Sequence, residues 1–308
     1  MPRCAVIDLG TNTFNLLIAE YSHNNYTILY KEEHPVKIGE GGITKNIIAE
    51  TPFQRGIDAL KKYKDIIQSF NIESIHAFAT SAIRSASNGE VFVRTAHLET
   101  GISIEVIPGD EEASFIYKGV ELAGILDDKP SLIMDIGGGS TEFIIADNKN
   151  LFWKQSFNLG VSRLLQKFNP SDPVSTSDLK KLCDFFDETL TPLFEQVKTF
   201  KPYEIIGCSG SFESFANMIQ MKNNYTKESE IFIQIDISDF SDLYETLLKS
   251  SEAERYQIKG LAAMRVDTIV FAAVFVKHLL KKLKLKKLIA SHYALKEGVL
   301  SDIIKYSF

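Results

Sequence analysis

Two stretches of the chain carry aspartate, glycine and hydroxyl-bearing residues in the same order. VIDLGTNTFNLLIA starts at residue 6, and IMDIGGGSTEFIIA starts at residue 133. Each places an aspartate, Asp8 or Asp135, two positions before a glycine, Gly10 or Gly137, and each closes with an apolar run. One such stretch could form an ordinary hairpin, but two of them indicate a structural unit that occurs twice.

The small residues after each aspartate could bind phosphate. A turn of small residues exposes several backbone N–H groups, and such a concave set of donors suits an anion. Consecutive glycines allow a ligand to approach the backbone closely, and hydroxyl side chains add further donors. A tight hairpin turn without a ligand is the alternative interpretation. The predicted phosphate-binding residues are Gly10, Thr11, Asn12 and Thr13 in the first stretch and Gly137, Gly138, Gly139, Ser140 and Thr141 in the second.

A third candidate phosphate site follows the apolar run YEIIGC. Ser209, Gly210 and Ser211 form the expected turn between this strand and a helical pattern. The free N–H groups and the dipole at the start of a helix favour an anion.

Other phosphate chemistries do not fit the sequence. No Gly-Lys pair occurs, which excludes a P-loop, and Glu142 stands where the GxGxxG motif requires its last glycine. No arginine lies six residues after Cys4 or Cys208, which excludes the Cys-x5-Arg mechanism, so Cys208 is expected to be a buried structural thiol.

Three carboxylates beside these turns are candidate metal ligands. Asp8, Asp135 and Glu142 supply hard oxygen atoms next to the expected phosphate sites. Mg²⁺ prefers such oxygen ligands and is held by a few carboxylates together with water and substrate oxygens. We therefore expect Mg²⁺ or another divalent cation, with turn capping as the alternative role of the two aspartates.

The apolar periodicity predicts alternating strands and helices. Strands are predicted over 4–9, 14–19 and 26–31, a helix over 53–70, and buried strands over 74–80 and 102–108. Asp110 is the expected N-cap of a helix that runs to about Leu122. The second unit covers 131–146, and a helix-rich region (161–199), a strand (203–208), a long helix (260–283) and a last strand (285–291) follow it.

This alternation predicts an α/β protein that is built twice. The polar, proline-bearing segment GILDDKPS at 124–131 is the expected boundary. We therefore predict a first subdomain over 1–128, on which 296–308 packs back, and a second subdomain over 129–295.

Composition limits the class of protein. The chain has 308 residues, 44% of them hydrophobic, and a formal charge of −6, which argues against general nucleic-acid binding. Its three cysteines have no CxxC spacing, so no disulfide framework is indicated. The longest clean apolar run, 269–276, is too short to span a bilayer, and Asp8 interrupts the apolar N-terminus, which excludes a signal peptide. We expect a cytoplasmic protein without a membrane partner.

Lysine is dense near the end of the long predicted helix. Such a run is usually a solvated helix face, but it could also attract a polyanion electrostatically. The residues are Lys277, Lys281, Lys282, Lys284, Lys286 and Lys287.

Several segments occur in the order found in one enzyme family. They are the two aspartate–glycine turns, ATSAIRSASN (79–88), IEVIPGDEEASFIYKGV (104–120), NLGVSRL (158–164), GCSGSFES (207–214) and ASHYALKEGVL (290–300). Through them the chain resembles the exopolyphosphatase/guanosine pentaphosphate phosphohydrolase family over nearly its whole length. The resemblance implies the fold of sugar kinases, chaperones and actin, in which two actin-like (ribonuclease H-like) α/β subdomains face an interdomain cleft.

The resemblance also implies roles for single residues. Glu112, the second glutamate of the EEA stretch, is expected to activate water. Arg84 matches an arginine that faces the cleft, so we expect it to bind phosphate, with an ion pair as the alternative. Arg163 is a further candidate. The family usually continues EEAR, whereas this chain has Ser114, a departure that bears on substrate preference.

The expected activity is Mg²⁺-assisted hydrolysis of a phosphoanhydride. The substrate would be inorganic polyphosphate, ranked first, or guanosine pentaphosphate at its 5′ γ-phosphate. From the family we also expect a homodimer and, because the chain ends at Phe308, a short form without the further C-terminal helical domain of many members. The alternatives are a small-molecule kinase of the same superfamily, which would need an acceptor, and a non-catalytic sensor of polyphosphate or nucleotide.

Overall fold

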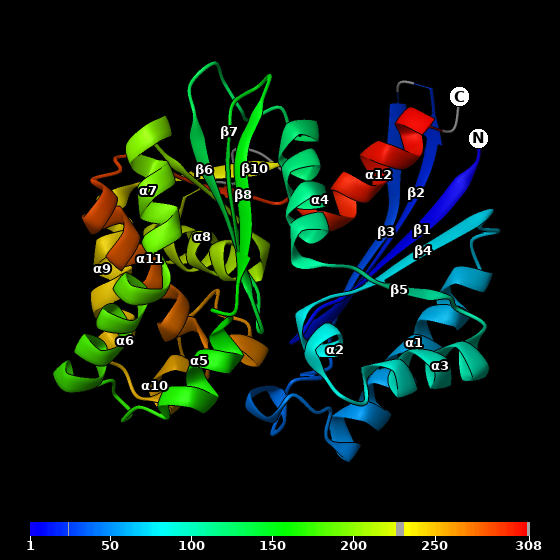
Figure 1. Cartoon of the computed structure of the whole chain (residues 1–308), viewed down its shortest axis with the longest axis horizontal. Coiled ribbons are helices and arrows are strands. Elements are labelled where there is room, and N and C mark those ends of the chain that lie inside the picture. Colours follow the sequence, from blue (N-terminus) through cyan, green and yellow to red (C-terminus); the bar gives the residue numbers. More distant parts are fainter. Residues whose placement is uncertain (24, 226–230, 307–308) are drawn as a thin grey trace.

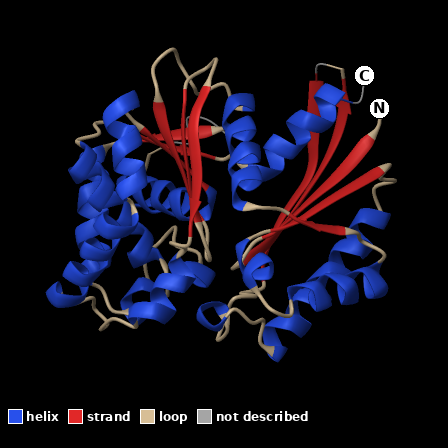
Figure 2. Ribbon diagram, viewed as in Figure 1, coloured by secondary structure: helices blue, strands red, loops and turns tan. Residues whose placement is uncertain are grey.

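The computed structural model describes residues 1–23, 25–225 and 231–306. It contains a five-stranded and a six-stranded sheet, each with helices packed on its outer face and two further helices between the sheets (Figure 1, Figure 2). The predicted α/β class is therefore confirmed.

The first sheet is built on the hairpin predicted from the first aspartate–glycine stretch. Its strands are β1 (Arg3–Leu9), β2 (Thr13–Ser22), β3 (Asn25–Pro35), β4 (Ser74–Ala79) and β5 (Ile104–Val106), in the spatial order β3-β2-β1-β4-β5. β1 and β2 are antiparallel, and β4 lies parallel to β1 on its other side. The strands predicted over 74–80 and 102–108 are present as β4 and β5. They are not buried as predicted, because β4 is buried only over its last three residues and the last two residues of the edge strand β5 are exposed.

The second sheet repeats this topology. Its strands are β6 (Ser131–Ile136), β7 (Thr141–Ala146), β8 (Leu151–Phe157), β9 (Ile205–Cys208), β10 (Phe232–Ile235) and β11 (Leu288–Ser291). The spatial order β8-β7-β6-β9-β11 corresponds to the first sheet, and β10 adds an antiparallel edge strand. β8 and β10 are absent from the sequence prediction, because β8 is half-buried over its first six residues and β10 is only four residues long.

The helices lie mostly on the outer faces of the sheets. Within the described residues, none of them combines the length and the apolarity that a bilayer crossing requires. They are α1 (Glu50–Gln68), α2 (Ser81–Ser85), α3 (Gly89–Thr100), α4 (Gly109–Leu122), α5 (Val161–Phe168), α6 (Thr176–Thr189), α7 (Thr191–Phe200), α8 (Ser209–Asn223), α9 (Ile237–Lys249), α10 (Glu252–Arg255), α11 (Ile269–Leu283) and α12 (Leu295–Tyr306), with the 3₁₀ turns η1 (Ile43–Lys45) and η2 (Ala263–Arg265).

Three local predictions need correction. The helix predicted over 260–283 begins only at Ile269, because Gly260 has a left-handed φ of +87° and Ala262 is extended, so a loop containing η2 precedes it. α4 is capped by Pro108, and Asp110 lies in its first turn. The turn predicted at 209–211 is the first turn of α8. α2 and α3 were not predicted.

Three hydrophobic cores hold these layers together. One lies under α1 and α3 on the outer face of the first sheet. A second lies on the outer face of the second sheet, where Phe186 of α6 stacks on Phe275 of α11 with ring centroids 4.3 Å apart. The third joins the inner faces of both sheets to α4 and α12, so these two helices pack the halves against each other.

α4 and α12 approach each other closely between the sheets (Figure 1). α12 contacts β1 and β2, whereas α4 contacts β7 and β8. A methyl group on Gly119 would overlap the carbonyl of Ala294, and one on Gly298 would overlap the carbonyl of Phe115. The division at residue 128, with 296–308 packing back on the first subdomain, stays a prediction, and residues 307 and 308 lie outside the described residues.

Candidate active site

A cavity of about 290 Å³ lies where the turns of both hairpins meet the starts of α8 and α12. All predicted site residues except Arg84, Thr141 and the further candidate Arg163 line it, although they come from distant parts of the chain. These residues are Asp8, Gly10, Thr11, Asn12, Thr13, Glu112, Asp135, Gly137, Gly138, Gly139, Ser140, Glu142, Ser209, Gly210 and Ser211.

The two hairpin turns touch each other across this cavity. A methyl group on Gly138 would lie 2.6 Å from Asn12 Oδ1, and one on Gly139 would lie 2.7 Å from Thr11 Oγ1. Ser162 Oγ donates to Asn12 Oδ1 at 2.6 Å and adds a third contact between the halves. The consecutive glycines are therefore needed for the two turns to approach.

The start of α5 fixes the second turn. The N–H groups of Val161 and Ser162 donate to the carbonyls of Gly137 and Gly138 at 3.0 and 2.9 Å. Arg163 Nε donates to the carbonyl of Gly139 at 3.0 Å, and its Nη1 donates to the η1 segment at 3.1 Å. Arg163 thus supports the turn from behind and does not line the cavity.

The third predicted turn begins α8 directly after β9. Ser209 has a left-handed φ of +68°, a conformation that costs a non-glycine residue of the order of 1 kcal/mol. Its hydroxyl side chain lowers the pKa of the Asp135 carboxyl, against the larger effect of burial. Cys208, which precedes it, is fully buried and is not in a disulfide, as predicted.

Asp8 and Asp135 occupy equivalent places in the two hairpins. Asp8 lies opposite Asn15 in the pairing of β1 with β2, and Asp135 lies opposite Glu142 in the pairing of β6 with β7. Asn15 Nδ2 donates to Asp8 Oδ2 at 3.2 Å. Asp8 thus faces an amide, whereas Asp135 faces the carboxylate of Glu142. Negative charge is therefore concentrated on the second hairpin.

Burial raises the pKa of the four predicted carboxyl groups at the cavity, those of Asp8, Glu112, Asp135 and Glu142. The pKa of Asp8 is above its usual value, and those of Asp135 and Glu142 are raised to about 6 and about 7. The negative charge of Asp135, together with burial, raises the pKa of Glu142. In the same way, burial and the charge of Glu142 raise the pKa of Glu112 well above its usual value. These carboxylates repel one another because they lie close together at a buried site, where little water screens their charges.

A divalent cation fits this chemistry because it would relieve that repulsion. Mg²⁺ is commonly bound by one or two carboxylates together with water and phosphate oxygens, so Asp8, Asp135 and Glu142 suit a partial set of ligands. In the part of the chain that the structure describes, no three His, Cys, Asp or Glu side chains form a metal-binding group by themselves.

Arg84 lies beside Glu112 and not in the cavity wall. Its Nη1 donates to Glu112 Oε2 at 2.9 Å and to the carbonyl of Ile107 at 2.8 Å. The charge of Arg84 lowers the pKa of Glu112, opposing burial and Glu142. Arg84 thus favours the carboxylate form that a general base requires, while its contact with phosphate stays a prediction.

Replacing Arg84 with methionine should move the acid limb of the pH–rate profile to higher pH. Glu112 acts as a base only when it is deprotonated, and without the guanidinium its pKa rises further. We expect a shift of about one pH unit or more in the acid-side pKa of kcat/KM for phosphate release. Arg84→Lys keeps a positive charge and serves as the control. An unchanged acid limb in Arg84→Met would contradict the coupling.

Two other predicted features lie away from the cavity wall. Thr141 is buried in β7, and its Oγ1 donates to the carbonyl of Leu159 at 3.0 Å. The lysines between 277 and 287 do not line the cavity either. Three of them have partners nearby: Lys277 with Ser241 at 2.7 Å, Lys282 with Asp187 at 2.6 Å and Lys287 with Glu204 at 2.9 Å.

Several charged residues at the cavity were not predicted. Arg265 was missed because its segment was interpreted as helix. Lys296 and Glu297 lie in the family segment ASHYALKEGVL (290–300), but no role was predicted for its charged residues. Two ion pairs join distant segments here: Lys31 Nζ of β3 lies 2.8 Å from Glu297 Oε1 of α12, and Arg265 pairs with Glu33 of β3. The unpredicted polar and charged lining residues include Lys31, Glu32, Glu33, Glu213, Arg265, Thr268, His292, Lys296 and Glu297.

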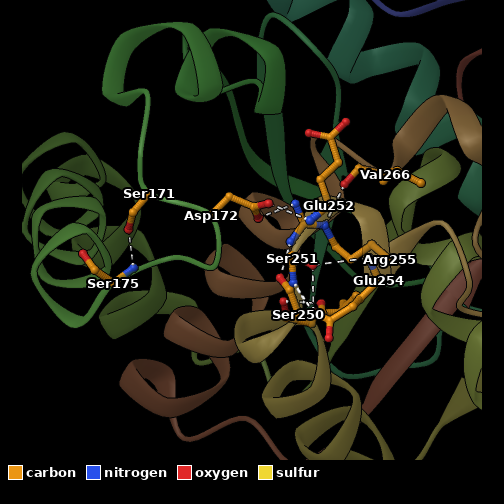
Figure 3. Close-up of polar contacts among 10 residues, drawn as sticks. Ser171, Asp172, Ser175, Ser250, Ser251, Glu252, Glu254, Arg255 and Val266 are labelled. Carbon is orange, nitrogen blue, oxygen red and sulfur yellow. Dashed lines mark hydrogen bonds and ion pairs between the residues drawn. The ribbon is translucent and has the colours of Figure 1, made fainter.

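A buried arginine holds the η2 segment, which carries Arg265 to the cavity (Figure 3). Arg255 Nε donates to the carbonyl of Val266 at 3.0 Å, and its Nη1 donates to the carbonyl of Ser250 at 2.6 Å. Its Nη2 donates to Asp172 Oδ1 at 2.9 Å. One side chain therefore joins the end of α9, the η2 segment and the distant loop that contains Asp172.

Replacing Arg255 with methionine should lower the free energy of unfolding by at least about 2 kcal/mol. The change leaves two carbonyls without their donor, and each unsatisfied buried group costs about 1–3 kcal/mol. Asp172 is half-exposed, so its lost ion pair adds little. Urea denaturation measures the effect, with the exposed Arg94→Met as control. Equal stability of the two variants would contradict the structural role of Arg255.

Sequence comparison relates the chain to proteins of known name. Residues 17–307 match the sequence profile of the Ppx/GppA phosphatase family. The chain is 33% identical over 287 residues to the bifunctional 3-dehydroquinate synthase/phosphatase of Fusobacterium nucleatum, covering 90% of this chain and 43% of that protein. It is 25% identical over 303 residues to the guanosine-5′-triphosphate,3′-diphosphate pyrophosphatase of Photobacterium profundum, covering 98% and 59%. The chain thus spans about half the length of these two relatives.

A solved structure shares the whole fold. The crystal structure of an exopolyphosphatase from Cytophaga hutchinsonii superposes with a TM-score of 0.95 at 38% identity, covering 98% of this chain and 97% of that one. This agreement, together with the repeated strand order, confirms the predicted fold of two actin-like (ribonuclease H-like) halves.

Proposed function

Because the chain belongs to the Ppx/GppA phosphatase family, we propose that it hydrolyses phosphoanhydride bonds. It would release terminal phosphate from inorganic polyphosphate or the 5′ γ-phosphate of guanosine pentaphosphate. The observation that carries this proposal is the convergence of three small-residue turns and a buried glutamate, Glu112, on one cavity. We rank polyphosphate first because the exopolyphosphatase of C. hutchinsonii matches the chain over nearly its full length.

In the proposed reaction, Glu112 accepts a proton from the attacking water. The water oxygen forms a bond to the terminal phosphorus while the bond from that phosphorus to the bridging oxygen breaks, and the shortened chain leaves. Arg84 holds the carboxylate of Glu112 in place. The backbone N–H groups and hydroxyls of the turns at 10–13, 137–140 and 209–211 bind the phosphoryl oxygens, whose negative charge they stabilise.

Mg²⁺ or another divalent cation is part of this proposal. Asp8, Asp135 and Glu142 are the residues that would hold it, since all three line the cavity. When bound, such a cation neutralises charge on the phosphoryl oxygens and orients them. The acidic wall of the cavity supports this requirement, because uncompensated carboxylates would repel a polyanionic substrate.

Phosphate release without an acceptor tests the proposal. The protein is incubated with long-chain polyphosphate or with guanosine pentaphosphate, with Mg²⁺ or with a chelator, and orthophosphate is measured over time. We expect Mg²⁺-dependent release from at least one substrate. Release that requires a hydroxyl acceptor would instead indicate a kinase, and binding without release would indicate a sensor.

We also propose that the protein works in the cytoplasm as a homodimer. The cysteines Cys4, Cys183 and Cys208 are free thiols, which suits a reducing compartment. The dimer rests on the resemblance to the family and is tested by light scattering on the purified chain.

A further inference from the structure

The positive charges at the cavity differ in how they are paired. Lys31, Arg265 and Lys296 are the lysine and arginine side chains that line it in the described part of the chain. Lys31 Nζ lies 2.8 Å from Glu297 Oε1, and Arg265 pairs with Glu33. Both of these cations therefore already have a carboxylate partner.

Lys296 has no such partner. It lies in the first turn of α12, and no described carboxylate is within 4 Å of its ammonium group. Burial works to lower the pKa of Lys296, but the charges of Glu297 and other nearby acids, Asp8 among them, outweigh burial and raise this pKa. Lys296 is therefore a charged ammonium group at neutral pH.

The acids that surround Lys296 each have another partner. Glu297 Oε2 accepts from the N–H of Ala294 at 3.0 Å while its Oε1 pairs with Lys31. Glu213 Oε1 lies 3.5 Å from a ring nitrogen of His292, and Asp8 accepts from Asn15 at 3.2 Å. None of these contacts needs Lys296, so its donors are available to a ligand in the cavity.

We propose that Lys296 binds the phosphoryl oxygens of the substrate, the role that the family resemblance implies for Arg84. Arg84 is held by Glu112 and Ile107 outside the cavity wall, whereas Lys296 lines the same cavity as the three phosphate turns. An ammonium group is a compact point charge with three donors, which suits an oxyanion whose position shifts during reaction. The inference rests on the proposed function, because it identifies one contact to that substrate.

Binding of tripolyphosphate to the full chain tests this inference. Calorimetry with Mg²⁺ present is carried out in the Glu112→Gln background, so that turnover does not consume the ligand. Lys296→Met should weaken binding by about 10- to 100-fold, because a hydrogen bond to a charged group is lost. Lys296→Arg, which keeps the charge, should bind nearly as well as the parent. Lys305→Met, at the exposed end of the same helix, is the matched control and should change nothing.

Two results would overturn the inference. One is unchanged affinity in Lys296→Met; the other is a weakening by Lys296→Arg as large as that by methionine. Thermal unfolding of each variant reports on the fold. If Lys296→Met does not fold, Lys296→Gln and Lys296→Arg carry the comparison. Failure of the proposed function gives a different result. If the wild-type protein releases no phosphate but Lys296→Met still weakens tripolyphosphate binding, hydrolysis is refuted and the contact between Lys296 and phosphate is retained.

Discussion

The Glu112→Gln variant is expected to lose turnover by about 10²- to 10⁴-fold, the usual contribution of a general base. Glutamine has nearly the shape of glutamate, and its Oε1 can still accept from Arg84, which lies 2.9 Å from Glu112 Oε2. The amide cannot take a proton from water. Affinity for the substrate should be kept, because the phosphate turns are unchanged.

Steady-state phosphate release and tripolyphosphate calorimetry measure these two effects separately. Glu111→Gln is the matched control, since Glu111 lies in the same first turn of α4 but does not line the cavity. This control should keep normal activity. Equal activity of the two variants would show that Glu112 is not the base.

Replacing Gly160 with alanine should lower kcat/KM by about 100-fold. A methyl group at Gly160 would overlap the backbone of Gly138 and Gly139. The start of α5 is hydrogen-bonded to the same turn, so the turn must move to accommodate the methyl group. Displacing a substrate-binding group by about 1 Å can cost about 100-fold in rate.

Gly124→Ala separates this effect from a loss of stability. An added methyl group at Gly124 would meet no atom within 4 Å, but the φ of +65° strains a non-glycine residue. This control should therefore lower the melting temperature and leave kcat/KM unchanged. If Gly160→Ala keeps wild-type kcat/KM, the geometry of the second turn is not limiting for the reaction.

The hairpins could be predicted from sequence because their determinants are local. Apolar runs on both sides of a small-residue turn specify the strands around Asp8 and Asp135, and the repeat of this pattern reveals the second sheet. The start of α4 after Pro108, which carries Glu112, is likewise a local feature. The lining residues of the two turns could therefore be named in advance, whereas Glu112 was singled out by the family resemblance.

The rest of the site depends on contacts between distant segments. Arg84 and Glu112 are 28 positions apart, and nothing in their spacing shows that they form an ion pair. The apolar residues over 260–268 favour a helix. The left-handed backbone at Gly260 prevents that helix, and the loop that forms instead places Arg265 at the cavity. Lys296 lies at the start of α12, whose close approach to α4 between the sheets depends on Gly119 and Gly298.

The central claim is that water attacks the terminal phosphorus of the substrate, and one isotope measurement tests it most directly. Wild-type protein is incubated with polyphosphate and Mg²⁺ in ¹⁸O-labelled water, without any acceptor, and the orthophosphate is examined by mass spectrometry. The proposed mechanism predicts that each released phosphate carries one oxygen atom from the solvent. Solvent oxygen found only in the remaining chain, or no release without an acceptor, would contradict it.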